Sequence, residues 1–279
     1  MNEEIVALLN KQKLHLQSLL KNIKIINKLI NDPTDNLSKI KQYQKKIKEI
    51  FPQIHLSEDY KRRIMDFLNS LDKEIRFWEE KRKNKFGLKL EEKLSELNLK
   101  LEGHYPLLKA SLYTMEVVFK KEEVVIWYGP QQEKLGKVRL NTEEVFKTIK
   151  KYHTEITNRK FDPNVFLKNL YTAYEYSLFR QNKGNGVQVP ISDILIEYTF
   201  LIQDRKFKLN PKKENYKNYT RAYFSYDLFL LPQKKLGNKE LILVTATRAY
   251  TRRASDFLWI PLDLKGNGVY ISHIKFREV

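Results

Sequence analysis

The apolar spacing of the first hundred residues is the feature that most restricts the fold. Isoleucine and leucine recur every three or four positions from residue 5 to residue 30, as on one face of a helix. Pro33 and Pro52 interrupt the pattern, because a residue before proline disfavours the helical conformation. A further stripe from residue 60 to residue 78 has the spacing of a coiled-coil seam. We therefore predict an antiparallel helical hairpin, coiled coil or small bundle over residues 1–102.

The pattern changes at residue 103, where strand-like and helical segments begin to alternate. Residues 107–119 and 124–128 are predicted to form two strands of a hairpin. Asn141 resembles a helix cap, and Asp162 followed by Pro163 predicts a second helix start. We assign residues 103–160 to a β-hairpin followed by a helix.

Residues 161–279 show the order helix, short strand, helix, helix, strand, strand, which is that of a winged helix. A helix over 192–202 would be the supporting helix, and one over 215–230 the recognition helix. Strands at 240–247 and 257–262 would form a hairpin whose tip, 248–253, is the wing. The predicted fold class is therefore α+β, with an N-terminal helical hairpin, a mixed α/β region and a winged-helix-like C-terminal part.

Positive charge is concentrated in this C-terminal part. Thirteen Lys or Arg and three Asp or Glu lie from Arg205 to Arg253, which is +10 of the formal net charge of +18. Such a concentration favours a polyanionic partner, and eight aromatic residues in the same segment could stack on unpaired bases. We expect Tyr219, Tyr223 and Tyr226 to belong mainly to the core.

Seven basic residues are the candidates for binding nucleic acid. Four lead into or along the expected recognition helix, and three lie at the expected wing tip, where arginine suits forked contacts with phosphate. The alternative for each is an ordinary solvated charge. The seven are Lys212, Lys213, Lys217, Arg221, Arg248, Arg252 and Arg253.

An enzymatic alternative is a Mg²⁺-dependent nuclease that uses Asp263 and Lys265. An acid and a lysine at a strand end form half of such a site, which also needs a second acid to share the metal. Asp256 is too close in sequence to serve, Asp227 is the distant alternative, and a simple polar turn is the better interpretation of Asp263 and Lys265. The five histidines are scattered, so we expect neither a resident metal nor a cofactor.

Composition also indicates where in the cell the protein acts. The chain has no cysteine, no signal-peptide pattern and no apolar run long enough to span a bilayer, so we expect a cytoplasmic protein without a membrane partner. The leading interpretation is a non-catalytic nucleic-acid-binding subunit of a larger complex, with DNA favoured over RNA. The N-terminal helices would bind a protein partner or a second copy. A structural adaptor for an acidic protein is the other alternative.

Overall fold

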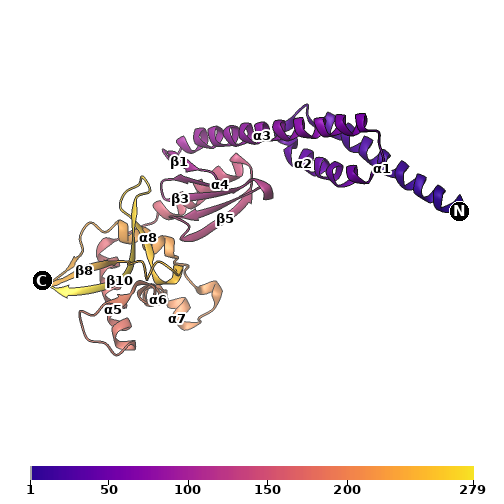
Figure 1. Cartoon of the computed structure of the whole chain (residues 1–279). Coiled ribbons are helices and arrows are strands. Elements are labelled where there is room, and N and C mark those ends of the chain that lie inside the picture. The colour runs from indigo at the N-terminus through magenta and orange to yellow at the C-terminus, as the bar shows by residue number, and fades with distance from the viewer. Residues whose placement is uncertain (1) are drawn as a thin grey trace. The chain divides into compact units, whose positions relative to one another are not determined.

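The computed structural model describes residues 2–279, which form a mixed α+β structure with eight α-helices and two antiparallel sheets. The chain divides into two compact units, the first ending at Lys89 and the second running from Leu90 to Val279 (Figure 1). Each unit has a hydrophobic core of its own.

The first unit contains three helices. These are α1 (Asn2–Leu29), α2 (Pro33–Ile50) and α3 (Glu58–Ser95), whose last turns lie beyond the unit. Lys48 pairs with Asp72, and Lys41 pairs with Glu79, so α2 and α3 run in opposite directions. The apolar stripes meet in a core that includes Leu19, Ile26, Ile40, Ile47 and Leu71. The predicted helical N-terminal region is confirmed.

The second unit begins with a five-stranded meander. Its strands, in spatial order, are β1 (Leu101–His104), β2 (Leu107–Ala110), β3 (Tyr113–Val118), β4 (Glu123–Tyr128) and β5 (Glu133–Arg139). The prediction of one strand over 107–119 is wrong, because the chain reverses at Ser111, which has a φ of 53°.

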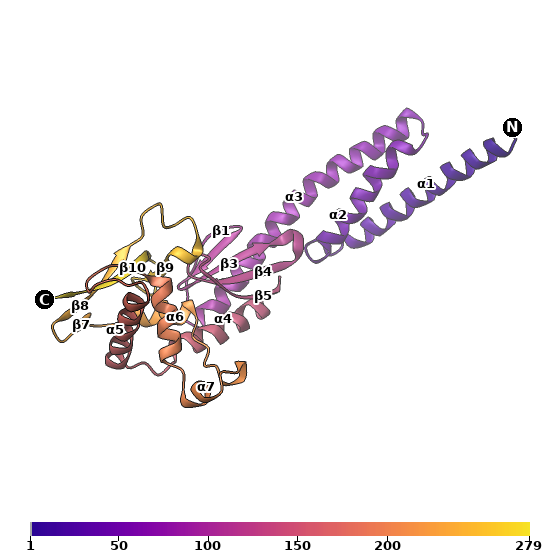
Figure 2. The ribbon, with the colours of Figure 1, turned by 90° about the horizontal axis from the view of Figure 1, so that it is seen from below.

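Two helices start where the sequence predicted. The Asn141 side chain accepts hydrogen bonds from the amides of Glu143 (2.8 Å) and Glu144 (3.2 Å) and caps α4 (Thr142–Thr157). Asp162 caps α5 (Pro163–Arg180) in the same way. Helix α4 packs against the β5 edge of the meander (Figure 2).

The second sheet is built around the long last strand. Its strands are β6 (Val189–Pro190), β7 (Lys235–Leu236), β8 (Lys239–Thr245), β9 (Leu258–Pro261) and β10 (Gly268–Glu278). The order is β6-β10-β8-β7, and β9 pairs with the first residues of β10. Core side chains come from α5, α6 (Ile191–Leu201) and α8 (Arg221–Phe229).

Two details of the winged-helix prediction are wrong. The strands expected to flank the wing tip do not pair with each other, because β8 and β9 each pair with β10. The expected helix over 215–230 begins only at Arg221, because Thr220 accepts a hydrogen bond from the amide of Tyr223 and caps it there. Lys217 therefore lies outside helix α8.

A turn at residues 129–132 joins the meander to the rest of the second unit. The Gln132 side chain accepts a hydrogen bond from the amide of Trp259, and the adjacent Glu133 accepts one from the amide of Ala222 at the start of α8 (2.7 Å). The Trp259 ring also lies so close to Gly129, at the start of this turn, that a β-carbon there would clash with it. These contacts bury one side of α8 under the meander.

Candidate nucleic-acid interface

The basic segment keeps its positive charge in the folded chain. No carboxylate within residues 2–279 lies at ion-pair distance from any of its thirteen Lys and Arg side chains. Eleven of the thirteen are exposed: Arg205, Lys206, Lys208, Lys212, Lys213, Lys217, Lys234, Lys235, Arg248, Arg252 and Arg253.

The acidic residues of the segment neutralise arginines outside it. Asp227 pairs with Arg159, and Glu240 pairs with Arg277 at 2.7 Å. Only Glu214 is left among the thirteen cations, and it forms no ion pair within the described chain. Two of the three acids of the segment are therefore neutralised by arginines outside it, and its own cations are left without a countercharge.

Lys212, Lys213 and Lys217 lie on one loop, residues 204–217, which leaves the end of α6 and carries the short helix α7 (Arg205–Leu209) (Figures 1 and 2). The buried Gln203 side chain closes the loop: its oxygen accepts from the Lys217 amide at 2.8 Å, and its nitrogen donates to the Lys217 carbonyl at 3.1 Å. The base of the loop is therefore fixed while its cations face solvent.

Arg248, Arg252 and Arg253 lie on the connection between β8 and β9, and all three are exposed. The Tyr250 ring packs edge-on against His273 of β10, with ring centroids 4.9 Å apart. Arg221 donates hydrogen bonds to the carbonyls of Ala254 and Phe257 at the other end of this connection. This connection, residues 246–257, which we call the arginine loop, is thus held at two points along its length.

Arg221 differs from the other predicted ligands. Its side chain is half-buried, and burial lowers the pKa of the guanidinium. Because it is hydrogen-bonded to main-chain carbonyls, Arg221 fixes the arginine loop and does not belong with the exposed cations.

Helix α8 does not present a surface to a partner. Six of its nine residues are buried, and the other three are only partly exposed. Tyr226 is buried, and Tyr219 and Tyr223 are half-buried, as expected for core and core-edge residues. Helix α8 therefore does not fit the recognition helix expected over 215–230, because the meander and the sheet cover it.

A cavity of about 380 Å³ adjoins the 204–217 loop. It lies among the start of α5, the end of α6, the segment before α8, and α8 itself, and Lys217 lines it. The aromatic residues in its wall are Phe161, Phe166, Tyr198, Tyr219 and Tyr223. Lys217, one of the residues predicted to bind nucleic acid, is therefore also part of a cavity.

A buried ion pair forms one wall of this cavity. The Asp227 carboxylate accepts hydrogen bonds from the Arg159 guanidinium and from the Tyr219 hydroxyl at 2.6 Å. Burial raises the pKa of Asp227, although Arg159 and Tyr219 act in the opposite direction. The Arg159 guanidinium lies 4.4 Å from the Tyr223 ring centroid, in cation–π contact.

Sequence reasoning missed Arg159 as part of the cavity and treated Asp227 only as a possible metal ligand. A signal was present, because Asp227 is the single acid in a helix of mostly aromatic and apolar residues. Acids in such positions are seldom buried without a cationic partner.

The residues of the nuclease alternative form a turn. The Asp263 carboxylate accepts hydrogen bonds from the Lys265 amide (2.7 Å) and from the Asn267 amide and side chain. Asp227 is engaged with Arg159 instead. No group of three or more acidic or histidine side chains in residues 2–279 is placed to hold a metal ion.

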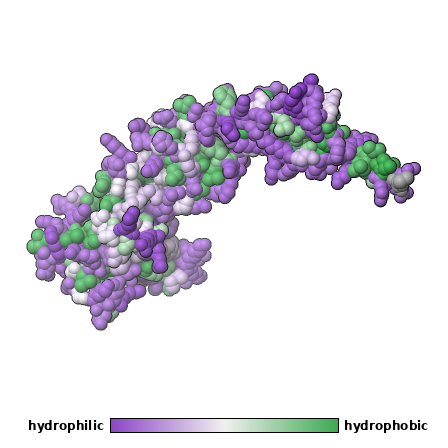
Figure 3. Space-filling view, viewed as in Figure 1, coloured by the Kyte–Doolittle hydropathy of each residue, from purple (hydrophilic) through white to green (hydrophobic). Residues whose placement is uncertain are grey.

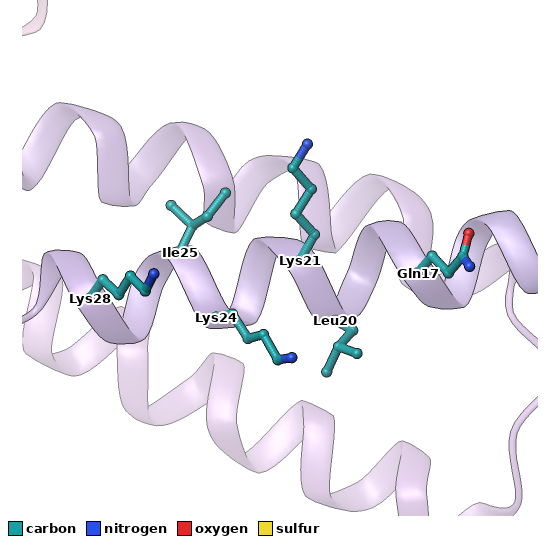
Figure 4. A pocket seen from close by; sticks show the side chains of 6 residues that line it. All are labelled: Gln17, Leu20, Lys21, Lys24, Ile25 and Lys28. Atoms are coloured by element: carbon teal, nitrogen blue, oxygen red, sulfur yellow. The ribbon is translucent and has the colours of Figure 1, made fainter.

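A second hollow, of about 320 Å³, follows α1 in the first unit. Its lining consists of α1 residues alone: Gln17, Leu20, Lys21, Lys24, Ile25 and Lys28 (Figure 4). In the close-up, Lys21 and Ile25 point to one side of the helix, and Leu20 and Lys24 point to the other. Its lining therefore forms no convergent set of polar groups.

No protein-family model matches the chain, and no curated protein or solved structure matches it. None of the described helices is both long and apolar enough to cross a membrane.

Proposed function

We propose that this chain is a non-catalytic nucleic-acid-binding subunit of a larger complex and that it grips the sugar–phosphate backbone, with DNA favoured over RNA. The observation that carries the proposal is the eleven exposed cations of the basic segment, which have no carboxylate partner in the described chain while two of the segment's acids pair elsewhere. Phosphates would supply the missing countercharge.

The loops, rather than a helix, would make these contacts. Both the 204–217 loop and the β8–β9 connection are fixed at defined points and expose their cations. The order of α5, β6, α6, α8, β8 and β10, with β10 between β6 and β8, supports a winged-helix-like arrangement. In that arrangement the β8–β10 connection, which contains Arg248, Arg252 and Arg253, takes the position of the wing.

The salt dependence of binding tests the proposal. Replacing Arg248, Arg252 and Arg253 by alanine removes three phosphate contacts. The negative slope of log K against log salt concentration should then become shallower, by about 2.7 on a duplex or about 2.1 on a single strand. Because all three are exposed, we expect little change in stability. Fluorescence anisotropy over a range of salt concentrations measures both slopes.

A matched control is the triple alanine variant at Lys109, Lys147 and Lys168. These residues are exposed, lie outside the basic segment and form no ion pair, so the variant removes the same net charge from elsewhere in the second unit. We expect its slope to stay close to that of the wild type. Equal slopes for the arginine variant and the wild type would refute the role of the arginine loop, and binding of polyglutamate in preference to nucleic acid would favour the adaptor.

We further propose that the first unit forms a docking surface for a second copy of the chain. The first turns of α1 extend beyond α2 and expose Ile5, Val6, Leu8 and Leu9, each at 54% or more (Figures 1 and 3). Ile5 and Leu9 continue the stripe that is buried further along α1. Such an apolar surface is typical of an interaction site.

Charge favours an antiparallel pairing of two α1 helices. The first turn contains Glu3 and Glu4, and the next turns contain Lys11 and Lys13. If Ile5 of one copy faces Leu9 of the other, Glu3 comes level with Lys11, whereas a parallel pairing would bring like charges together. The paired segment is only about ten residues long, or about 15 Å, so the association should be weak and depend on concentration.

A further inference from the structure

The cavity beside the 204–217 loop is placed to meet any polymer that the loop binds. Lys217 ends the loop and lines the cavity, and Lys160 lines it as well. Neither lysine forms an ion pair in the described part of the chain. A phosphate held by Lys217 would therefore bring the attached sugar and base to the cavity.

The wall of the cavity is preorganised around Arg159. Four of the five guanidinium N–H groups are used: one donates to the Ile156 carbonyl, two to Asp227 and one to the Tyr223 carbonyl. One N–H on Nη1 is left, and the side chain is 24% exposed. The Tyr223 ring already packs against the guanidinium, so Arg159 offers the cavity one free N–H donor and no further stacking surface.

Two further polar side chains of the lining are free to bind a ligand, whereas the Asp162 carboxylate caps α5. The side-chain amides of Asn169 and Asn218 make no hydrogen bond with any described residue. A carboxamide can form paired hydrogen bonds with the edge of a nucleobase. The lining thus combines aromatic walls, two free amides, two free ammonium groups and the carboxylate of Asp162.

The size of the cavity limits the ligand. At about 380 Å³ it is near the lower end of the range for small-molecule sites, about 300–1,000 Å³, which is enough for one base. We propose that this cavity binds a single unpaired nucleobase, with Lys160 and Lys217 contacting the adjoining phosphates. If the base belongs to a strand, this inference rests on the proposed nucleic-acid binding. The base of a free nucleotide has the same chemistry and could bind without it.

Comparing strands with and without bases separates the affinity due to the base from the affinity due to the phosphates. Affinity is measured for a short oligodeoxyadenylate and for an abasic strand of equal length, which has the same phosphates. We expect the wild type to prefer the strand with bases by at least about 10-fold, from the stacking of one base together with its hydrogen bonds to the two amides. In the double variant Asn169→Ala, Asn218→Ala this preference falls at least about 5-fold, because two hydrogen bonds to the base are lost.

The triple alanine variant at Arg248, Arg252 and Arg253 is the control. It should weaken binding of both strands and leave their ratio unchanged. Equal binding of the two strands by the wild type, or an unchanged ratio in the asparagine variant, would overturn the cavity site and leave backbone binding intact.

Deoxyadenosine monophosphate, titrated by calorimetry, distinguishes the sources of the base. If neither strand binds but the mononucleotide binds and the asparagine variant abolishes this, the cavity is a site for a free nucleotide and the proposed polymer binding fails. If no strand and no mononucleotide binds, both proposals fail. Circular dichroism of the variant confirms that it remains folded.

Discussion

Replacing Arg159 by methionine should destabilise the second unit, and by more at pH 8 than at pH 5. Asp227 is 3% exposed and receives hydrogen bonds from Arg159 and Tyr219. Methionine keeps much of the apolar stem but removes the cation, so the carboxylate is left buried without a countercharge. Breaking a buried ion pair in this way costs about 3–5 kcal/mol.

The pH dependence follows from the direction of the pKa shift. Burial raises the pKa of Asp227 above its ordinary value of 3.8, and Arg159 opposes this, so the variant should have a still higher pKa. A folded state with a raised carboxyl pKa binds a proton while the unfolded state is ionised. The free energy of unfolding therefore increases as the pH falls through the folded pKa toward 3.8, by up to about 1.4 kcal/mol per pH unit.

Urea unfolding at several pH values measures the effect. A Trp78→Phe background leaves Trp127 and Trp259, both in the second unit, as the fluorescent reporters. The double variant Arg159→Met, Asp227→Asn should lack the additional pH dependence. Arg277→Met breaks a more exposed pair and should cost at most about 1 kcal/mol. A loss of stability in Arg159→Met that is equal at pH 5 and pH 8 would show that Asp227 is not its source.

Two further perturbations separate other features. Changing Ile5 and Leu9 to lysine should abolish concentration-dependent dimers seen by light scattering, whereas Leu14→Lys, also on an exposed part of α1, should not; dimers that survive the first change would exclude the proposed pairing. Burial lowers the pKa of His153, so the stability that its neutral form provides is present above pH 6.5 and lost as the pH falls below that value. Thermal unfolding between pH 7.5 and pH 5.5 should show a decrease that is smaller in His153→Gln, and an equal decrease would contradict this assignment.

Local signals in the sequence predicted local structure well. Asn141 and Asp162 cap the helices that they were expected to cap, because the side chain and its amide partners are within three residues of each other. The apolar stripe of α1 likewise marks a helix whose later turns are buried. In these cases the residues that decide the structure are close together in the chain.

Signals that depend on distant partners were missed. Strand β5 has no regular alternation of apolar and polar residues, so only its pairing with β4 identifies it. Strands β8 and β9 both pair with β10, which no pattern within the two strands shows. The segment before Arg221 was expected to be helical, but hydrogen bonds between Gln203 and Lys217 hold it extended.

The burial of α8 determines what kind of recognition this chain can provide. Reading a base sequence in a groove needs an element whose side chains can enter it, and α8 has no exposed residue. Contacts of exposed lysines and arginines with phosphates give affinity that depends on salt but not on sequence. If the chain binds nucleic acid as proposed, the cavity offers a source of base preference, because Asn169, Asn218, Asp162 and the free N–H of Arg159 could distinguish one base edge from another.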